Sequence, residues 1–176
     1  GQTNLGLAML YHALNQSDEI LAERSFAPWV DMEAEMRKNA IPLFSLENKK
    51  ALKEFDILGF TLPYESIYTN VLNILDLSAI PLFSKERDMS FPLIIGGGQA
   101  TFNPEPMSEF FDAFVVGEGE EVVLEISKLY SIFQKEGASK QDLLAGLSKI
   151  EGVYVPSLYD VSYQTDGRIA AIKPTR

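Results

Sequence analysis

The sequence contains no cysteine, and this absence excludes several kinds of site at once. None of the 176 residues can form a disulfide or supply a thiolate to zinc or to an iron–sulfur cluster. Histidine is almost as scarce, because His12 is the only one, and a lone imidazole inside an expected helix cannot build a metal centre. We therefore expect no metal ligand in this chain, and no residues arranged as a Ser-His-Asp or Cys-His set.

Positive charge and long hydrophobic runs are also lacking. The chain has 15 Lys and Arg against 25 Asp and Glu, a net charge of −10. Such an acidic surface repels phosphate backbones, so nucleic acid is not an expected partner. Without a long apolar run or a signal peptide we expect no membrane span and a cytoplasmic location. A hydrophobic content of 46% in a chain of this length suits one compact domain with a small appendage.

Strand-like and helix-like patterns alternate along the chain. Near-continuous apolar runs at residues 53–63, 91–98 and 113–119 are typical of strands buried on both faces, and residues 22–28 indicate a shorter strand. Helical periodicity follows at residues 5–14, 31–40, 67–79, 106–112, 120–137 and 140–150. This order predicts an α/β fold: a Rossmann-like (flavodoxin-like), doubly wound parallel sheet in a three-layer α/β/α arrangement.

The two ends of the sequence differ from this pattern. The chain enters a helix almost at its start, so we expect the first strand of the fold to precede Gly1. Near the C-terminus, polar and apolar residues alternate around Asp166-Gly167, which predicts a β-hairpin. We divide the chain into an α/β domain at residues 1–152 and a hairpin or connector at residues 153–176.

Small and polar residues stand at the ends of the buried runs. In an open parallel sheet, ligands bind beyond the carboxyl ends of the strands, and three such ends carry unusual residues at 59–64, 96–101 and 117–121. Each has a plainer interpretation as well. The glycines at 96–98 can serve a tight turn, Thr61 can fill a strand position, and Glu118 can stabilise a helix start. The dinucleotide fingerprint GxGxxG and the Walker GKS/T motif are both absent.

The segments "DILGFTLPYESIYTNVLNILDLSAIPL", "PLIIGGGQATFNPEP" and "DAFVVGEGEEV" together resemble the N-terminal cobalamin-binding-like domain of a radical S-adenosylmethionine (radical SAM) protein family. The resemblance covers nearly the whole chain. It implies a module that binds a cofactor or positions a substrate for a radical SAM barrel of the same polypeptide. A 4Fe-4S cluster and S-adenosylmethionine would belong to that barrel, in an iron–sulfur oxidoreductase or methyltransferase type of enzyme, and this chain itself would not be catalytic.

The resemblance also implies a cobalamin site. Thr61-Leu62-Pro63 stands where the cobalamin-binding fold has Ser-x-Leu, with proline in place of the leucine, and Gly96-Gly97 stands where the fold has Gly-Gly. The nucleotide tail would pass Thr61 and the glycines, and the corrin ring would lie near Tyr64 and Glu118. The Asp and His of the family's DxHxxG loop would precede Gly1, and His12 is not carried over as a cobalt ligand. The expected cofactor-binding residues are Thr61, Leu62, Tyr64, Gly96, Gly97, Gly98, Gly117 and Glu118.

Two other functions stay open at this stage. The same fold with a degenerate cobalamin site would serve as a structural or docking domain, which the substitution at Pro63 favours. A flavin-binding flavodoxin-like domain is the third possibility. A receiver domain would need an aspartate where Thr61 stands.

Overall fold

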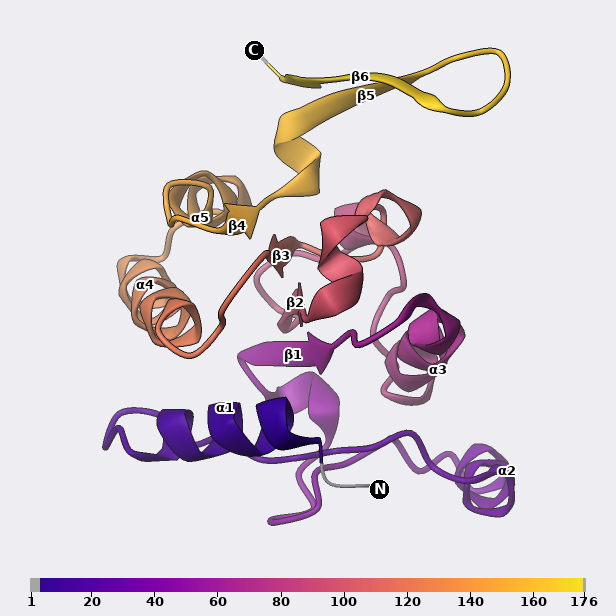
Figure 1. The fold of residues 1–176 in the computed structure, drawn as a ribbon. Helices are drawn as coiled ribbons and strands as arrows, with labels where there is room; N and C mark the ends of the chain where they lie inside the picture. The colour runs from indigo at the N-terminus through magenta and orange to yellow at the C-terminus, as the bar shows by residue number, and fades with distance from the viewer. Residues whose placement is uncertain (1–3, 176) are drawn as a thin grey trace.

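A four-stranded sheet forms the centre of the computed structural model, which describes residues 4–175 (Figure 1). The strands follow one another in the order β1-β2-β3-β4, and the first three pair in parallel. Their bounds are β1 Ile57–Thr61, β2 Leu93–Gly97, β3 Ala113–Val115 and β4 Val153–Tyr154. The expected α/β fold with a mostly parallel sheet is confirmed. The last strand, β4, was not expected and pairs antiparallel with β3.

Helices cover both faces of this sheet, as the apolar runs indicate (Figure 1). On one face, Ile94 of β2 packs with Val71 and Leu75 of α3. On the other face, Ile95 packs with residues of α4 and α5, such as Ile126. The helices are α1 Leu5–Asn15, α2 Val30–Lys38, α3 Tyr68–Leu77, α4 Val122–Glu136 and α5 Lys140–Leu147. No helix in residues 4–175 combines the length and apolar character needed to cross a membrane.

The helix ends follow from local side-chain chemistry. Asn4 caps α1, because its side chain accepts a hydrogen bond from the Leu7 N–H at 3.2 Å. Gly137 ends α4 with a φ of 66°, in the left-handed region that favours glycine. Ser139 and Asp142 form a capping box that begins α5.

One predicted strand is wrong, and one predicted helix is shorter than expected. Residues 22–28 form no strand, and their one backbone hydrogen bond to a neighbouring segment runs from the Leu46 N–H to the Arg24 carbonyl. A strand needs a partner along its length, which this segment does not have among the described residues. At residues 106–112 the predicted short helix is reduced to a 3-10 helix over Glu105–Met107, which a turn follows. Met107 and Phe111 of this segment are buried in the core on the α3 face of the sheet.

The C-terminal hairpin is confirmed. Strands β5 (Tyr159–Tyr163) and β6 (Ile169–Pro174) pair antiparallel, and the ribbon extends away from the sheet (Figure 1). At its turn Gly167 has a φ of 84°, and the Asp166 carboxylate accepts the Arg168 N–H. Because β4 belongs to the main sheet, residues 153–154 pair with the body of the fold. The division at residue 152 stays a prediction.

A buried carboxylate ties the amino ends of the central strands together. Asp112 precedes β3 with its side chain fully buried, and it accepts the Ile94 N–H at 2.7 Å. The Lys140 ammonium lies 2.7 Å away and the Arg87 guanidinium 3.2 Å away, and Ser84 donates its hydroxyl to the same carboxylate. Asp112 therefore joins β2, β3, the start of α5 and the loop before β2.

Removing the Asp112 carboxylate should destabilise the fold. Asp112→Ala leaves the buried Arg87 and the partly buried Lys140 without their counter-ion, so we expect it to lower the free energy of unfolding by about 3–5 kcal/mol in urea titrations. The control is Asp18→Ala, an exposed site whose loss should change stability by about 0.5 kcal/mol or less. Equal effects of the two variants would contradict a structural role for the Asp112 network.

A second charged cluster joins α2 to α3 at the surface. Arg37 contacts Glu33 at 2.9 Å and Asp76 at 2.7 Å, and Asn73 donates its amide to Glu33. The hydrogen bonds from Asn73 and from Arg37 hold the pKa of Glu33 below its ordinary value of 4.5.

The pH dependence of stability should report on this cluster. A carboxyl whose pKa is lower in the folded chain stabilises it above the ordinary pKa, and this stabilisation is lost as the pH falls through the folded pKa. The melting temperature of Glu33→Gln should therefore fall less than that of the unmodified protein when the pH is lowered from about 7 to about 3. Glu19→Gln removes the same charge at an exposed position away from α3. If the melting temperatures of both variants fell equally as the pH was lowered, the interactions of Glu33 would make no contribution to stability.

Candidate functional site

The carboxyl ends of β1, β2 and β3 meet at one edge of the sheet. Thr61 pairs with Gly97, and Gly97 pairs in turn with Val115, so the three strand ends lie side by side. We call this edge the carboxyl rim; it comprises Thr61, Gly97, Val115 and the loops that follow them. The register places the Thr61 side chain on the same face as Gly97, the face that α4 and α5 cover farther along the sheet.

Gly96 and Leu62, two of the expected ligand residues, lie in the core below the rim. Leu62 is only 1% exposed. A Cβ added at Gly96 would lie 2.9 Å from side-chain atoms of Leu62 and of Phe114, and 3.0 Å from Phe111. Packing between these side chains is a sufficient reason for a glycine at position 96.

The backbone explains Gly98 in a different way. Gly98 has a φ of 110°, and a Cβ there would lie 2.9 Å from the Leu62 carbonyl oxygen. That oxygen is held in place because it accepts the Ala100 N–H at 2.9 Å, while the Leu62 N–H donates to the Gly97 carbonyl at 2.6 Å. Thr101 is buried, and its hydroxyl lies within hydrogen-bond distance of the Gly98 and Val115 carbonyls. The loop after β2 is therefore fixed by its own hydrogen bonds.

Gly97 has neither of these reasons to be glycine. Its φ lies outside the left-handed region, and a Cβ added there would meet no atom within 4 Å. Its neighbour Thr61 is half-buried, and no hydrogen bond in the described part of the chain uses the Thr61 hydroxyl. The surface at Gly97 is therefore bare backbone beside a free hydroxyl group.

Open space continues at the end of β3. Gly117 needs glycine for its φ of 113°, yet a Cβ there would also meet nothing within 4 Å. Glu118 next to it is exposed, and so is Tyr64 in the loop after β1. The structure thus brings Thr61 and Gly97 together and leaves Tyr64 and Glu118 on surface loops, with no hydrogen bond among residues 4–175 that links them to that pair.

One pair at this end of the fold was missed by the sequence analysis. The Tyr154 hydroxyl of β4 donates to the Glu105 carboxylate at 2.7 Å. Burial, and then this hydrogen bond, raise the pKa of Tyr154 far above its ordinary value, so the phenol stays protonated. The pair ties the "FNPEP" loop to β4. The motif was visible in the sequence, but its partner could not be found because β4 was not expected.

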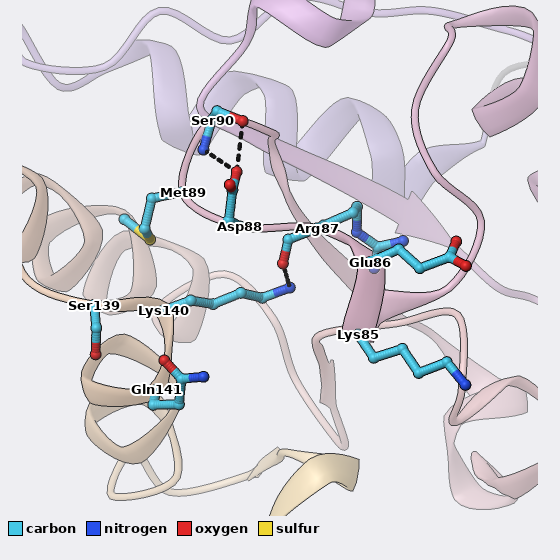
Figure 2. A pocket seen from close by; sticks show the side chains of 9 residues that line it. All are labelled: Lys85, Glu86, Arg87, Asp88, Met89, Ser90, Ser139, Lys140 and Gln141. Atoms are coloured by element: carbon cyan, nitrogen blue, oxygen red, sulfur yellow. Dashed lines mark hydrogen bonds between the residues drawn. The ribbon is translucent and has the colours of Figure 1, made fainter.

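The cavity in Figure 2 lies at the opposite end of the sheet, near the Asp112 network. Its volume is about 490 Å³, and its walls come from the loop before β2 and the start of α5. Figure 2 shows the Lys140 ammonium donating to the Arg87 carbonyl and Ser90 bonding to Asp88. The same ammonium also donates to the Ser84 carbonyl at 2.8 Å. Lys140 and Ser90 are hydrogen-bonded here, whereas the buried Nε of Arg87 has no hydrogen-bond partner among the described residues. The cavity lies away from the carboxyl rim and forms no part of it.

The family model described as "Radical SAM proteins, N-terminal" matches residues 6–156. The chain belongs to this family. It is also 34% identical over 89 residues to an uncharacterized protein of Methanocaldococcus jannaschii; the aligned stretch is 49% of this chain and 18% of that protein. No solved structure matches the chain.

The radical SAM family implies an iron–sulfur cluster, and these residues do not fit one. The chain has no cysteine, and residues 4–175 contain no group of three or more His, Cys, Asp or Glu that could hold a metal ion. His12 lies on α1, where its Nε2 is 2.8 Å from the Gln16 amide nitrogen. An iron–sulfur cluster would need thiolate ligands that this chain does not have.

Alanine substitutions should separate the glycines that the fold needs from the one that it does not. Gly98→Ala strains φ and drives a Cβ against the Leu62 carbonyl, so it should cost about 2 kcal/mol or more in chemical unfolding. Gly97→Ala should be neutral or stabilising by about 0.5–1 kcal/mol, because it restricts the unfolded chain at a compatible site. A loss at Gly97 as large as that at Gly98 would show that the fold itself requires glycine there.

Proposed function

We propose that this chain is a ligand-binding module of a radical SAM protein, and that its ligand lies on the carboxyl rim over Gly97 beside Thr61. The observation that carries the proposal is the absence of any structural reason for glycine at position 97, in contrast to positions 96 and 98. A residue without a side chain leaves the backbone accessible to a bulky guest. The position also agrees with the general rule that ligands bind beyond the carboxyl ends of parallel strands.

Cobalamin is the ligand that we propose for this rim. The resemblance of the Thr61 and Gly96-Gly97 segments to cobalamin-binding signatures supports it, and so does the open space above both Gly97 and Gly117. Thr61 would donate its hydroxyl to the nucleotide tail, and Gly97 would let that tail lie against β2. Tyr64 and Glu118 would face the corrin ring. Cobalamin supplies methyl-transfer or electron-transfer chemistry when bound, and this chain would hold and orient it.

The partner that we propose for this module is a radical SAM catalytic domain in the same polypeptide. The family match supports this, since the family is described as the N-terminal part of radical SAM proteins. The relative from Methanocaldococcus jannaschii is far longer than the stretch that aligns with this chain. The 4Fe-4S cluster and S-adenosylmethionine would be bound by that domain, because this chain has no thiolate to offer.

A docking domain with a degenerate site is the second candidate. Two observations favour it. Packing in the core is enough to explain why Leu62 and Gly96 are present, so neither residue requires a ligand. The one histidine lies on α1, so the rim has no imidazole. A flavin is the third candidate, and no observation at the rim favours it.

Spectroscopic titration tests the proposal. Hydroxocobalamin added to the purified protein should give a saturable change in the visible spectrum. Gly97→Trp should abolish that change, because the indole would fill the space above β2. Gln141→Trp is the matched control: it adds the same side chain at an exposed position by the opposite end of the sheet and should leave binding intact. Circular dichroism and melting temperature would verify that both variants fold.

The alternatives give different results. A folded protein with no spectral change supports the docking domain and rejects the cobalamin site. A yellow protein that retains flavin on purification supports the third candidate. Equal binding by Gly97→Trp and by the control would place the ligand elsewhere and reject Gly97 as its platform.

A further inference from the structure

The outer edge of β1 is unpaired. The Leu93 N–H donates to the Asp56 carbonyl and the Leu62 N–H donates to the Gly97 carbonyl, so even-numbered residues of this segment bond to β2. In a parallel pair the bonding residues alternate, so the N–H and C=O groups of Ile57, Gly59 and Thr61 point away from β2. No hydrogen bond within residues 4–175 satisfies them from the other side, and Gly59 is exposed.

The sequence of β1 is that of an internal strand. Its residues ILGFT include no charge and no proline, the features that normally protect a sheet edge from pairing. Leu58 and Phe60 contact the core on the α3 face, and Ile57 contacts the core on the opposite face. Near-continuous apolar strands of this kind are found inside parallel sheets, with neighbours on both sides.

Helix α1 gives independent evidence for a missing neighbour. It is strongly apolar, yet none of its residues is buried, and Leu5 is 74% exposed. Its described neighbour is the region of α4, where a Cβ at Gly119 would lie 3.5 Å from Leu10. Helix α1 lies on the outer side of β1 (Figure 1). A helix of this composition needs a sheet beneath it, and the sheet ends at β1.

Residues 20–28 lie farther out from β1 than the position that the missing neighbour would occupy. This segment follows α1 and runs on the outer side of β1 in the same direction as that strand (Figure 1). It has no strand partner, and Leu21 and Phe26 are 71% and 37% exposed. The strand predicted for residues 22–28 fails to form here because it has nothing to pair with.

We propose that a strand from the same polypeptide, preceding Gly1, inserts between β1 and residues 20–28. It would run parallel to β1, pair with Ile57, Gly59 and Thr61, and lie under the apolar side of α1. Residues 20–28 would then become the strand on its far side. The sheet would gain the reversal of strand order that defines a doubly wound fold.

The geometry favours the same polypeptide over a second copy of the chain. Helix α1 begins on the side where β1 ends and runs back in the opposite direction (Figure 1). A strand parallel to β1 would therefore finish next to the start of α1 and join it through a short loop, as in βαβ units. A second copy would bring another net charge of −10 against this one, which opposes edge-to-edge pairing.

Amide hydrogen exchange at single-residue resolution tests the pairing in the full-length gene product. Ile57, Gly59 and Thr61 should be protected as well as Leu58 and Phe60, and this protection should not change on dilution. Exchange at the three odd-numbered amides about 100-fold faster than at their neighbours would overturn the proposal, because it would show an open edge. Protection that disappears on dilution would assign the edge to a second copy and overturn it equally.

Two further measurements identify the strand. A photo-crosslinking p-benzoylphenylalanine in place of Leu21 should be recovered joined to a peptide that precedes Gly1. A crosslink to any other segment or to a second chain would overturn the proposed source. Gly59→Pro removes the outward N–H, whereas Gly59→Ala keeps it and meets only Ile95 at 3.9 Å. In the full-length protein the proline variant should melt about 5 °C or more below the alanine variant, and equal melting temperatures would contradict pairing at this edge.

Discussion

The register between β1 and β2 is the constraint from which the arrangement of the site follows. Two hydrogen bonds fix it, from the Leu93 N–H to the Asp56 carbonyl at 2.9 Å and from the Leu62 N–H to the Gly97 carbonyl at 2.6 Å. Together they pair Thr61 with Gly97 and direct Leu62 into the core. A slip of one residue would exchange these roles, burying Thr61 and placing Leu62 on the opposite face. The same alternation decides which amides of β1 face outward.

The two ends of the sheet are built in different ways. At the amino ends, buried charge is neutralised by direct pairing: the Asp112 carboxylate is shared by Lys140, Arg87 and a backbone N–H. Such a network holds loops rigidly but leaves few free groups for a ligand. At the carboxyl ends, backbone contacts hold the loop after β2, and no charged pair is needed near Gly97. This division leaves the rim as the part of the sheet where a guest could be received without breaking the fold.

Much of the fold could be predicted from sequence because the signals are local. The apolar runs of β1, β2 and β3, the Asn4 cap, the Gly137 stop and the Asp166-Gly167 turn each depend on neighbouring residues. The elements that the sequence did not predict correctly depend on residues far away in the sequence. Strand β4 has only two residues and exists because β3 offers an edge, and residues 22–28 stay irregular because no neighbour is present. At the site, three adjacent glycines look alike in sequence, and only the surrounding atoms distinguish Gly97 from Gly96 and Gly98.

The open rim and the open edge of β1 meet at one residue. Thr61 ends β1, pairs with Gly97 on its inner side, and directs its own N–H and C=O outward. A strand added along β1 would end beside Thr61, so its last residues would extend the rim on the outer side of Thr61. The ligand surface of this module would then be shared between the described rim and the added strand. If the rim holds a cofactor as proposed, a chain with no cysteine and with its one histidine on α1 would contribute shape and backbone, and reactive groups would come from segments joined to it.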